Sequence, residues 1–133
     1  DEIQNRRTFH DGSYLIYLDE ILKISDVVVL TLPLDKNTEG LFSESKFNVM
    51  KTGSILVNIA RGKIVDETAL IRALDGRLYG AVIDVTSVEP LPNDSKLWEK
   101  QNVILTPHNS FVGDGNNQRL FDLIFSNLKG ELK

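Results

Sequence analysis

The sequence predicts an α/β fold built on a parallel sheet. Three apolar runs of strand length, Val27 to Leu32, 54–59 and Gly80 to Val85, are separated by segments of helical periodicity. Runs with almost no polar residue are typical of strands buried on both faces, as in parallel sheets. Strands that alternate with helices imply βαβ units with right-handed crossovers.

The first third of the chain should contain one helix between two strands. Residues 1–13 are polar and include Gly12, so we expect a loop there. A short strand from Tyr14 to Tyr17 should follow, and Leu18 to Ile24 has the apolar spacing of a helix. The next strand, Val27 to Leu32, should end at Pro33, because proline cannot donate to a sheet ladder.

Two helices flank the second buried strand. Ser43 should cap a helix that runs to about Met50, after the loop 34–40. Asn58 alone interrupts the apolar run Ile55 to Ile59. Asp66 is a good N-cap for a helix from Glu67 to Leu74.

The last third should add two strands and a helix. The strand from Gly80 to Val85 leads into a proline-marked loop at 89–92, beneath which Leu97 and Trp98 should pack. Val103 to Leu105 should form the last strand, and Asn116 or Asn117 should cap a final amphipathic helix. We expect the apolar face of that helix to point inward: Leu120, Phe121, Ile124, Phe125 and Leu128.

Composition excludes several classes of function. A net charge of −4 without a basic run gives no sign of nucleic acid or of an anionic membrane as a partner. The absence of cysteine excludes disulfides and thiolate metal sites, and two histidines, His10 and His108, argue against a multi-histidine metal site. Without an apolar run of about 18 residues or an apolar N-terminus, we expect no membrane span and no signal peptide. A cytoplasmic location is compatible with this composition.

Three residues that can do chemistry each follow their own strand. Arg61, Glu89 and His108 should therefore meet at the carboxyl edge of the sheet, where open α/β folds bind ligands. A carboxylate orients a neighbouring imidazole and raises its pKa, and a guanidinium can hold a carboxylate or carbonyl oxygen. The trio suits proton transfer on an oxygen of an anionic substrate. Each residue taken alone also fits a role outside catalysis. Arg61 could pair with a neighbouring carboxylate, Glu89 could be a solvated loop carboxylate, and His108 could be an ordinary loop histidine.

Four long motifs resemble a known family: SDVVVLTLPLDKNTEGLF, MKTGSILVNIARGKIVDETALIRAL, GAVIDV with the later EP, and NVILTPH. They are similar to the NAD-binding domain of the D-isomer-specific 2-hydroxyacid dehydrogenases. The resemblance implies that Arg61 binds the substrate's carboxylate and carbonyl oxygens and that Glu89 tunes the catalytic His108. It implies an oxidoreductase that passes a hydride between NAD or NADP and a D-2-hydroxy acid or 2-keto acid.

The same resemblance implies a set of cofactor-binding residues. Asp84 would hold the nicotinamide carboxamide, and Pro33 would cover the adenosine half. The other members would be Asp1, at the ribose, Ile59, Ala60 and Arg61 beside the nicotinamide, and His108 and Ser110.

The chain also departs from the family pattern. It contains no GxGxxG, so we expect a partial Rossmann-like, doubly wound parallel sheet whose first βαβ unit is absent. Residues 1–133 would form the C-terminal part of a dinucleotide-binding domain, and the substrate-binding domain would be absent from this chain. Glu2 is an alternative to Asp1 at the ribose, and Arg6 with Arg7 could suit the 2′-phosphate of NADP. After His108 the family usually has small apolar or glycine residues, whereas Asn109, Ser110 and Phe111 follow here.

A second function from another class stays open. Relatives of this fold act as corepressors, so a non-catalytic, nucleotide-sensing interaction module is the alternative to an enzyme. Formate dehydrogenases carry Gln beside the histidine, and Glu89 argues against them. For the enzyme we expect a small 2-keto or 2-hydroxy acid as substrate and a homodimer of the intact protein, with no nucleic acid or membrane as partner. The isolated chain should be inactive.

Overall fold

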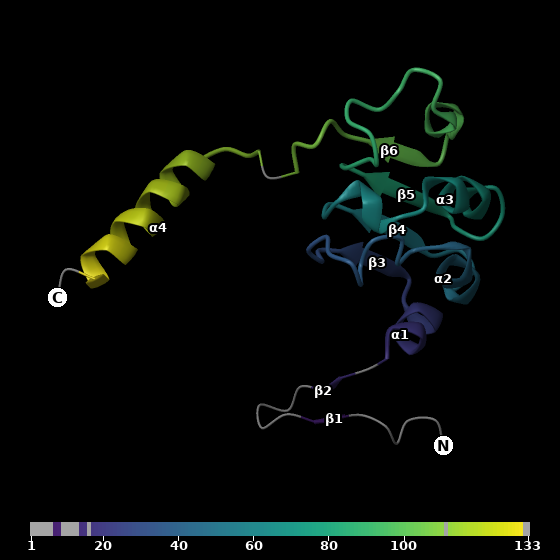
Figure 1. Ribbon diagram of the computed structural model, residues 1–133, viewed down its shortest axis with the longest axis horizontal. Coiled ribbons are helices and arrows are strands. Elements are labelled where there is room, and N and C mark those ends of the chain that lie inside the picture. Colours follow the sequence, from purple (N-terminus) through teal and green to yellow (C-terminus); the bar gives the residue numbers. More distant parts are fainter. Residues whose placement is uncertain (1–6, 9–13, 16, 111, 132–133) are drawn as a thin grey trace.

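The protein folds around one parallel sheet, with a helix at a distance from it (Figure 1). The computed structural model describes residues 7–8, 14–15, 17–110 and 112–131. In chain order, the elements are β1 Arg7–Thr8, β2 Tyr14–Leu15, α1 Leu18–Ile24, β3 Val27–Leu30, α2 Glu44–Val49, β4 Ile55–Asn58, η1 Gly62–Ile64, α3 Glu67–Leu74, β5 Gly80–Ile83, η2 Lys96–Glu99, β6 Val103–Leu105 and α4 Asn116–Glu131.

The sheet confirms the predicted α/β class. Four strands pair in the order β3-β4-β5-β6, and every pair is parallel. Ile55 of β4 lies opposite Val27 on one side and Gly80 on the other, so the first residues of these three strands are in register. All four therefore end at the same edge, which collects the loops that follow them.

Helices α1, α2 and α3 lie next to one another on the same side of the sheet (Figure 1). Their inward residues and the strand residues beneath them form one hydrophobic core. Burying each large apolar side chain contributes roughly 1.5–3 kcal/mol relative to leaving it in water. The fully buried apolar members are Leu22, Phe42, Phe47, Met50, Leu56, Ile64, Leu70 and Leu97.

Local signals explain where α3 begins. Asp66 has an extended backbone, and its carboxylate accepts hydrogen bonds from the N–H groups of Thr68 and Ala69 at 2.9 and 3.1 Å. These bonds satisfy two of the donors that a helix start leaves unpaired. Ser43 stands at the corresponding place before α2, but its hydroxyl pairs with the hydroxyl of Ser45 instead of capping the helix.

Three expectations are wrong at the ends of the chain and in one loop. Within the predicted loop 1–13, β1 pairs antiparallel with β2, apart from the main sheet. Trp98 stays half exposed, although its indole N–H donates to the Pro92 carbonyl, while Leu97 is buried as expected.

The third wrong expectation concerns α4, which lies away from the sheet (Figure 1). Its apolar residues Leu120, Phe121, Ile124 and Phe125 are 49–60% exposed rather than inward. Periodicity identifies the face of a helix that suits burial, but it does not say which surface covers that face.

Candidate active site

The last two strands of the sheet bring a histidine and a glutamate together. Glu89 lies in the loop after β5, His108 follows β6, and the histidine's Nδ1 is 2.8 Å from Glu89 Oε2. The hydrogen bond from His108 lowers the pKa of Glu89 below its ordinary value, although partial burial opposes this effect. Glu89 is therefore ionised near neutral pH and accepts from Nδ1. Nε2 makes no hydrogen bond within the described part of the chain.

The loop that carries Glu89 is fixed from several directions. Glu89 Oε1 accepts a hydrogen bond from the Thr86 N–H at 3.1 Å, and the Thr86 hydroxyl donates to the Val88 carbonyl at 2.8 Å. The next N–H, that of Ser87, donates at 2.6 Å to Glu67 in the first turn of α3. The loop that carries the Glu89 carboxylate is therefore held by hydrogen bonds within the loop and by a hydrogen bond to α3.

Asp84, directly after β5, is buried behind the histidine. Its Oδ1 accepts from the Thr106 hydroxyl at 2.5 Å and from the Asn109 N–H at 2.9 Å, and its Oδ2 accepts from the Ser110 N–H at 3.0 Å. Burial alone would raise the pKa of Asp84, but the hydrogen bonds from Thr106, Ser110 and Asn109 outweigh it and hold that pKa far below its ordinary value. Asp84 is therefore a buried, fully ionised carboxylate.

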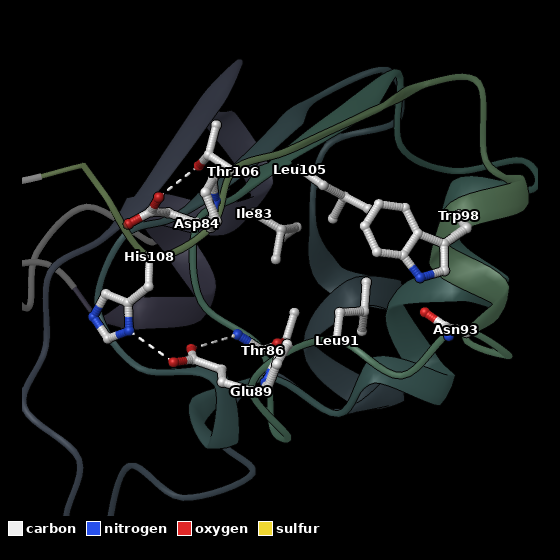
Figure 2. A pocket seen from close by; sticks show the side chains of 12 residues that line it. Ile83, Asp84, Thr86, Glu89, Leu91, Asn93, Trp98, Leu105, Thr106 and His108 are labelled. Carbon is white, nitrogen blue, oxygen red and sulfur yellow. Dashed lines mark hydrogen bonds and ion pairs between the residues drawn. The ribbon is translucent and has the colours of Figure 1, made fainter.

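A cavity of about 640 Å³ lies beside the pair. Six of its twelve lining residues are apolar, namely Ile83, Pro90, Leu91, Trp98, Leu105 and Pro107, and six are polar, namely Asp84, Thr86, Glu89, Asn93, Thr106 and His108. Figure 2 shows the His108 imidazole and the Glu89 carboxylate facing each other at one end of this lining, with Leu91 and Trp98 toward the other end.

Arg61 lines a second hollow, of about 520 Å³, at the ends of β3 and β4. Pro33, Ile59 and Ala60 line the same hollow, so four residues predicted to meet the cofactor are brought together. The guanidinium donates to the Ala60 carbonyl at 2.6 Å. No described contact joins Arg61 to Glu89 or His108.

The turn at Arg61 nevertheless touches the loop of Glu89. A Cβ at Gly62 would lie 2.0 Å from the carbonyl carbon and oxygen of Thr86, a distance that no side chain tolerates. Glycine is required there because two backbones meet. Buried Asn58 shapes the same turn, accepting from the Ala60 N–H at 3.1 Å and donating to the Arg61 carbonyl at 3.2 Å.

The predicted site residues thus fall into two neighbouring groups. Glu89, His108, Asp84 and Ser110 gather at the ends of β5 and β6, and the Arg61 group gathers one strand away. Asp1 lies outside the described residues.

Sequence reasoning missed the supporting residues Asn58, Glu67 and Thr106. Asn58 had a readable signal, because an asparagine that ends an apolar run often bonds its own backbone. Glu67 and Thr106 bond groups about 20 residues away, and local sequence does not record such pairings.

Two further observations concern the described residues as a whole. None of their helices combines the length and hydrophobicity needed to cross a membrane. They also hold no group of three or more His, Cys, Asp or Glu side chains arranged to bind a metal ion.

Residues 2–110 match a family model described as the NAD binding domain of D-isomer specific 2-hydroxyacid dehydrogenases. A glyoxylate reductase of Thermococcus onnurineus is 42% identical over 118 residues, which are 88% of this chain and 35% of the relative. A hydroxypyruvate reductase of Blautia hydrogenotrophica is 36% identical over 134 residues, covering 100% of this chain and 42% of the relative.

A solved structure of a protein with the same family description is also similar to this chain. The D-isomer specific 2-hydroxyacid dehydrogenase of Xanthobacter autotrophicus, in complex with NADPH and MES, is 44% identical with a TM-score of 0.67. The match covers 68% of this chain and 29% of that one. The chain spans about a third of the length of the curated relatives it matches first.

These matches give no support to a corepressor-type module. The parallel sheet, the carboxylate–imidazole pair at its carboxyl edge and the match over residues 2–110 agree with one another. The chain belongs to the D-isomer specific 2-hydroxyacid dehydrogenase family.

Proposed function

We propose that the protein is an NAD(P)-dependent oxidoreductase that interconverts a 2-keto acid and a D-2-hydroxy acid, with His108 as its proton carrier. The contact between His108 Nδ1 and Glu89 Oε2 at 2.8 Å carries this proposal. Because Nδ1 donates to an ionised Glu89, Nε2 is left to exchange a proton with a substrate oxygen. During reduction His108 donates this proton to the former keto oxygen, and Glu89 stabilises the positive charge of the imidazolium that does so.

Arg61 would hold the anionic end of the substrate. Its guanidinium is exposed at the rim of the second hollow and bonds only its neighbour's carbonyl within the described residues, so part of its fork of five donors remains available. Such a fork can bond a carboxylate oxygen and a keto oxygen at the same time, which a single point charge does less well. Arg61 would thus orient the substrate while His108 moves its proton.

The hollow beside Arg61 would receive part of a nicotinamide dinucleotide. Its volume is in the usual range for small-molecule sites, and the partly exposed apolar side chains of Leu32, Leu34 and Ile59 offer faces to flat rings. Pro33, Ile59, Ala60 and Arg61 would hold the cofactor there. When bound, the nicotinamide supplies or accepts the hydride. For Ser110, whose N–H already donates to Asp84, and for Asp1, cofactor contacts stay predictions.

The relatives suggest which substrates to try first. Glyoxylate and hydroxypyruvate appear in the names of similar proteins, and both are small 2-keto acids of the kind that Arg61 and His108 suit. We also propose a cytoplasmic homodimer, which cell fractionation and light scattering of the intact protein would test.

Steady-state oxidation of NADH and NADPH by the intact protein, with glyoxylate and with hydroxypyruvate, tests the proposal. We expect His108→Gln to lower kcat about 10²–10⁴-fold, the usual contribution of a positioned acid–base group, with cofactor affinity nearly unchanged. The matched control is His10→Gln, the other histidine of the sequence, which should keep wild-type turnover. A wild-type protein that turns over no 2-keto acid, or a His108→Gln variant with undiminished kcat, would contradict the proposal.

A further inference from the structure

The two groups of the candidate site stand on two different connections of the chain. Arg61 lies on the connection from β4 to α3, and Glu89 lies on the connection from β5 to β6. The first connection is short and hydrogen-bonded: the N–H of Ile64 donates to the Arg61 carbonyl at 3.2 Å, and α3 follows with Glu67 as its first residue. Arg61 and Glu67 therefore belong to one rigid unit, which we call the Arg61 turn.

The second connection begins with residues 86–89, which we call the Glu89 loop. Figure 2 shows Thr86 beside the carboxylate of Glu89, and both hydrogen bonds of Thr86 stay within this loop. Among the described residues, two hydrogen bonds lead from the loop to another part of the chain. One joins Glu89 to the imidazole, and the other runs from the Ser87 N–H to Oε1 of Glu67 at 2.6 Å. The bond to Glu67 thus fixes the loop independently of the histidine.

We propose that Glu67 is a positioning residue, which ties the Glu89 loop to the Arg61 turn and thereby sets the spacing between the substrate anchor and the proton carrier. A backbone N–H bound by a carboxylate forms a charge-assisted hydrogen bond, stronger than one between neutral groups. Gly62 meets the same peptide group, because a Cβ there would lie 2.5 Å from the Ser87 nitrogen. Packing against Gly62 stops the loop from moving closer, and the bond to Glu67 stops it from moving away.

The proposal rests on the proposed function for the roles of Arg61 and His108, but its first test needs no turnover. The hydrogen bond from His108 is the largest cause of the lowered pKa of Glu89, so this pKa reports whether the loop holds the carboxylate against the imidazole. It is measured from the Cδ chemical shift of ¹³C-labelled glutamate in the intact protein, and the signal missing in Glu89→Gln belongs to Glu89. In Glu67→Ala we expect the pKa of Glu89 to rise toward its ordinary value. Loss of a nearby negative charge alone would lower that pKa instead, so the sign separates lost position from lost charge.

Kinetics of the intact protein then test the spacing. With Glu67→Ala we expect kcat to fall about 10- to 100-fold, the upper value being the effect of a misplacement of roughly 1 Å. The KM of the 2-keto acid and the dissociation constant of the cofactor should change by about threefold at most, because the Arg61 turn itself is intact. Glu67→Gln keeps an oxygen that accepts the Ser87 N–H, so it should restore kcat to within about threefold of the wild type. Glu44→Ala is the matched control, because Glu44 begins α2 as Glu67 begins α3, and its ion pair with Arg72 is exposed.

Hydrogen exchange of the wild type decides the matter if Glu67→Ala does not fold. Ser87 is exposed, yet its N–H should exchange far more slowly than that of an unstructured peptide. Exchange at the unstructured rate overturns the proposal. So does a Glu67→Ala variant with the wild-type kcat and the wild-type pKa of Glu89, or a Glu67→Gln variant as impaired as Glu67→Ala. A wild type inactive with every 2-keto acid would instead refute the proposed function, and the pKa and exchange measurements would still test the tie between the loop and the turn.

Discussion

Gly62 joins the two halves of the candidate site, and replacing it with alanine should disturb both. Ordinary contacts with a Cβ begin at 3.4 Å, whereas the new methyl group would lie 2.0 Å from the backbone of Thr86. The two segments must therefore separate by about 1.4 Å. Neither side is a flexible side chain that could turn aside, so the loop that carries Glu89 has to move.

The magnitude of this change follows from overpacking. Forcing a group into a packed site costs about 1–3 kcal/mol, and here the obstacle is backbone. For a domain of this size, about 3–5 °C of Tm is lost per kcal/mol, so we expect a drop of roughly 3–15 °C. If half of the movement reached Glu89, its 2.8 Å contact with His108 would stretch to about 3.5 Å. We expect kcat to fall by up to about 100-fold.

Thermal unfolding and steady-state kinetics check this prediction. The matched control is Gly76→Ala, because a Cβ there meets nothing within 4 Å and the backbone is not left-handed. That variant should equal the wild type or gain about 0.4–1 kcal/mol, since alanine restricts the unfolded chain. A Gly62→Ala variant as stable and active as Gly76→Ala would refute the close approach of the two loops.

Three more predictions concern single side chains. Because the pKa of Glu89 is lower in the folded state, ionised Glu89 stabilises the fold. This stabilisation is complete above the unfolded pKa of Glu89, about 4.3, and is lost as the pH falls through its folded pKa. Urea unfolding should therefore show a smaller loss of stability between pH 6 and pH 3 in Glu89→Gln than in the wild type, and equal losses would contradict it. Arg61→Lys keeps the charge but loses the planar fork, so kcat/KM for the 2-keto acid should fall about 10- to 150-fold, for a bond worth roughly 1.5–3 kcal/mol; wild-type kinetics would make Arg61 a structural cation. Asp66→Ala removes both cap bonds of α3 and should cost about 0.5–2 kcal/mol in the free energy of unfolding, whereas Asp94→Ala should stay within about 0.5.

The elements that local sequence specifies were predicted well. The spacing of apolar residues located α1 and β6 to the residue, and Asp66 marked the start of α3. The parallel sheet followed from apolar runs that alternate with helices. These signals act over a few residues, so a single sequence contains them in full.

The long-range contacts of the site were beyond such reasoning. The sequence placed Glu89 and His108 at one edge but could not show that Arg61 lies in a separate hollow. A contact of Asp84 with the cofactor stays a prediction, but local sequence could not show that its carboxylate meets donors that are 22 to 26 residues further along the chain. Burial of an ionised group depends on partners that tertiary packing supplies, and no local pattern records them.

The order of the sheet has a consequence for handling the protein in solution. Within the described residues β3 is an outer strand, paired only with β4, and Val27 and Val29 are about half exposed. Uncharged, β-branched residues on an outer strand with unpaired backbone groups form a template onto which another chain can add. β6, at the opposite edge, has only three residues and offers a poorer template. When these 133 residues are produced alone, their tendency to aggregate should therefore begin at β3, and a lysine at Val27 or Val29 is the substitution of choice for keeping them monomeric.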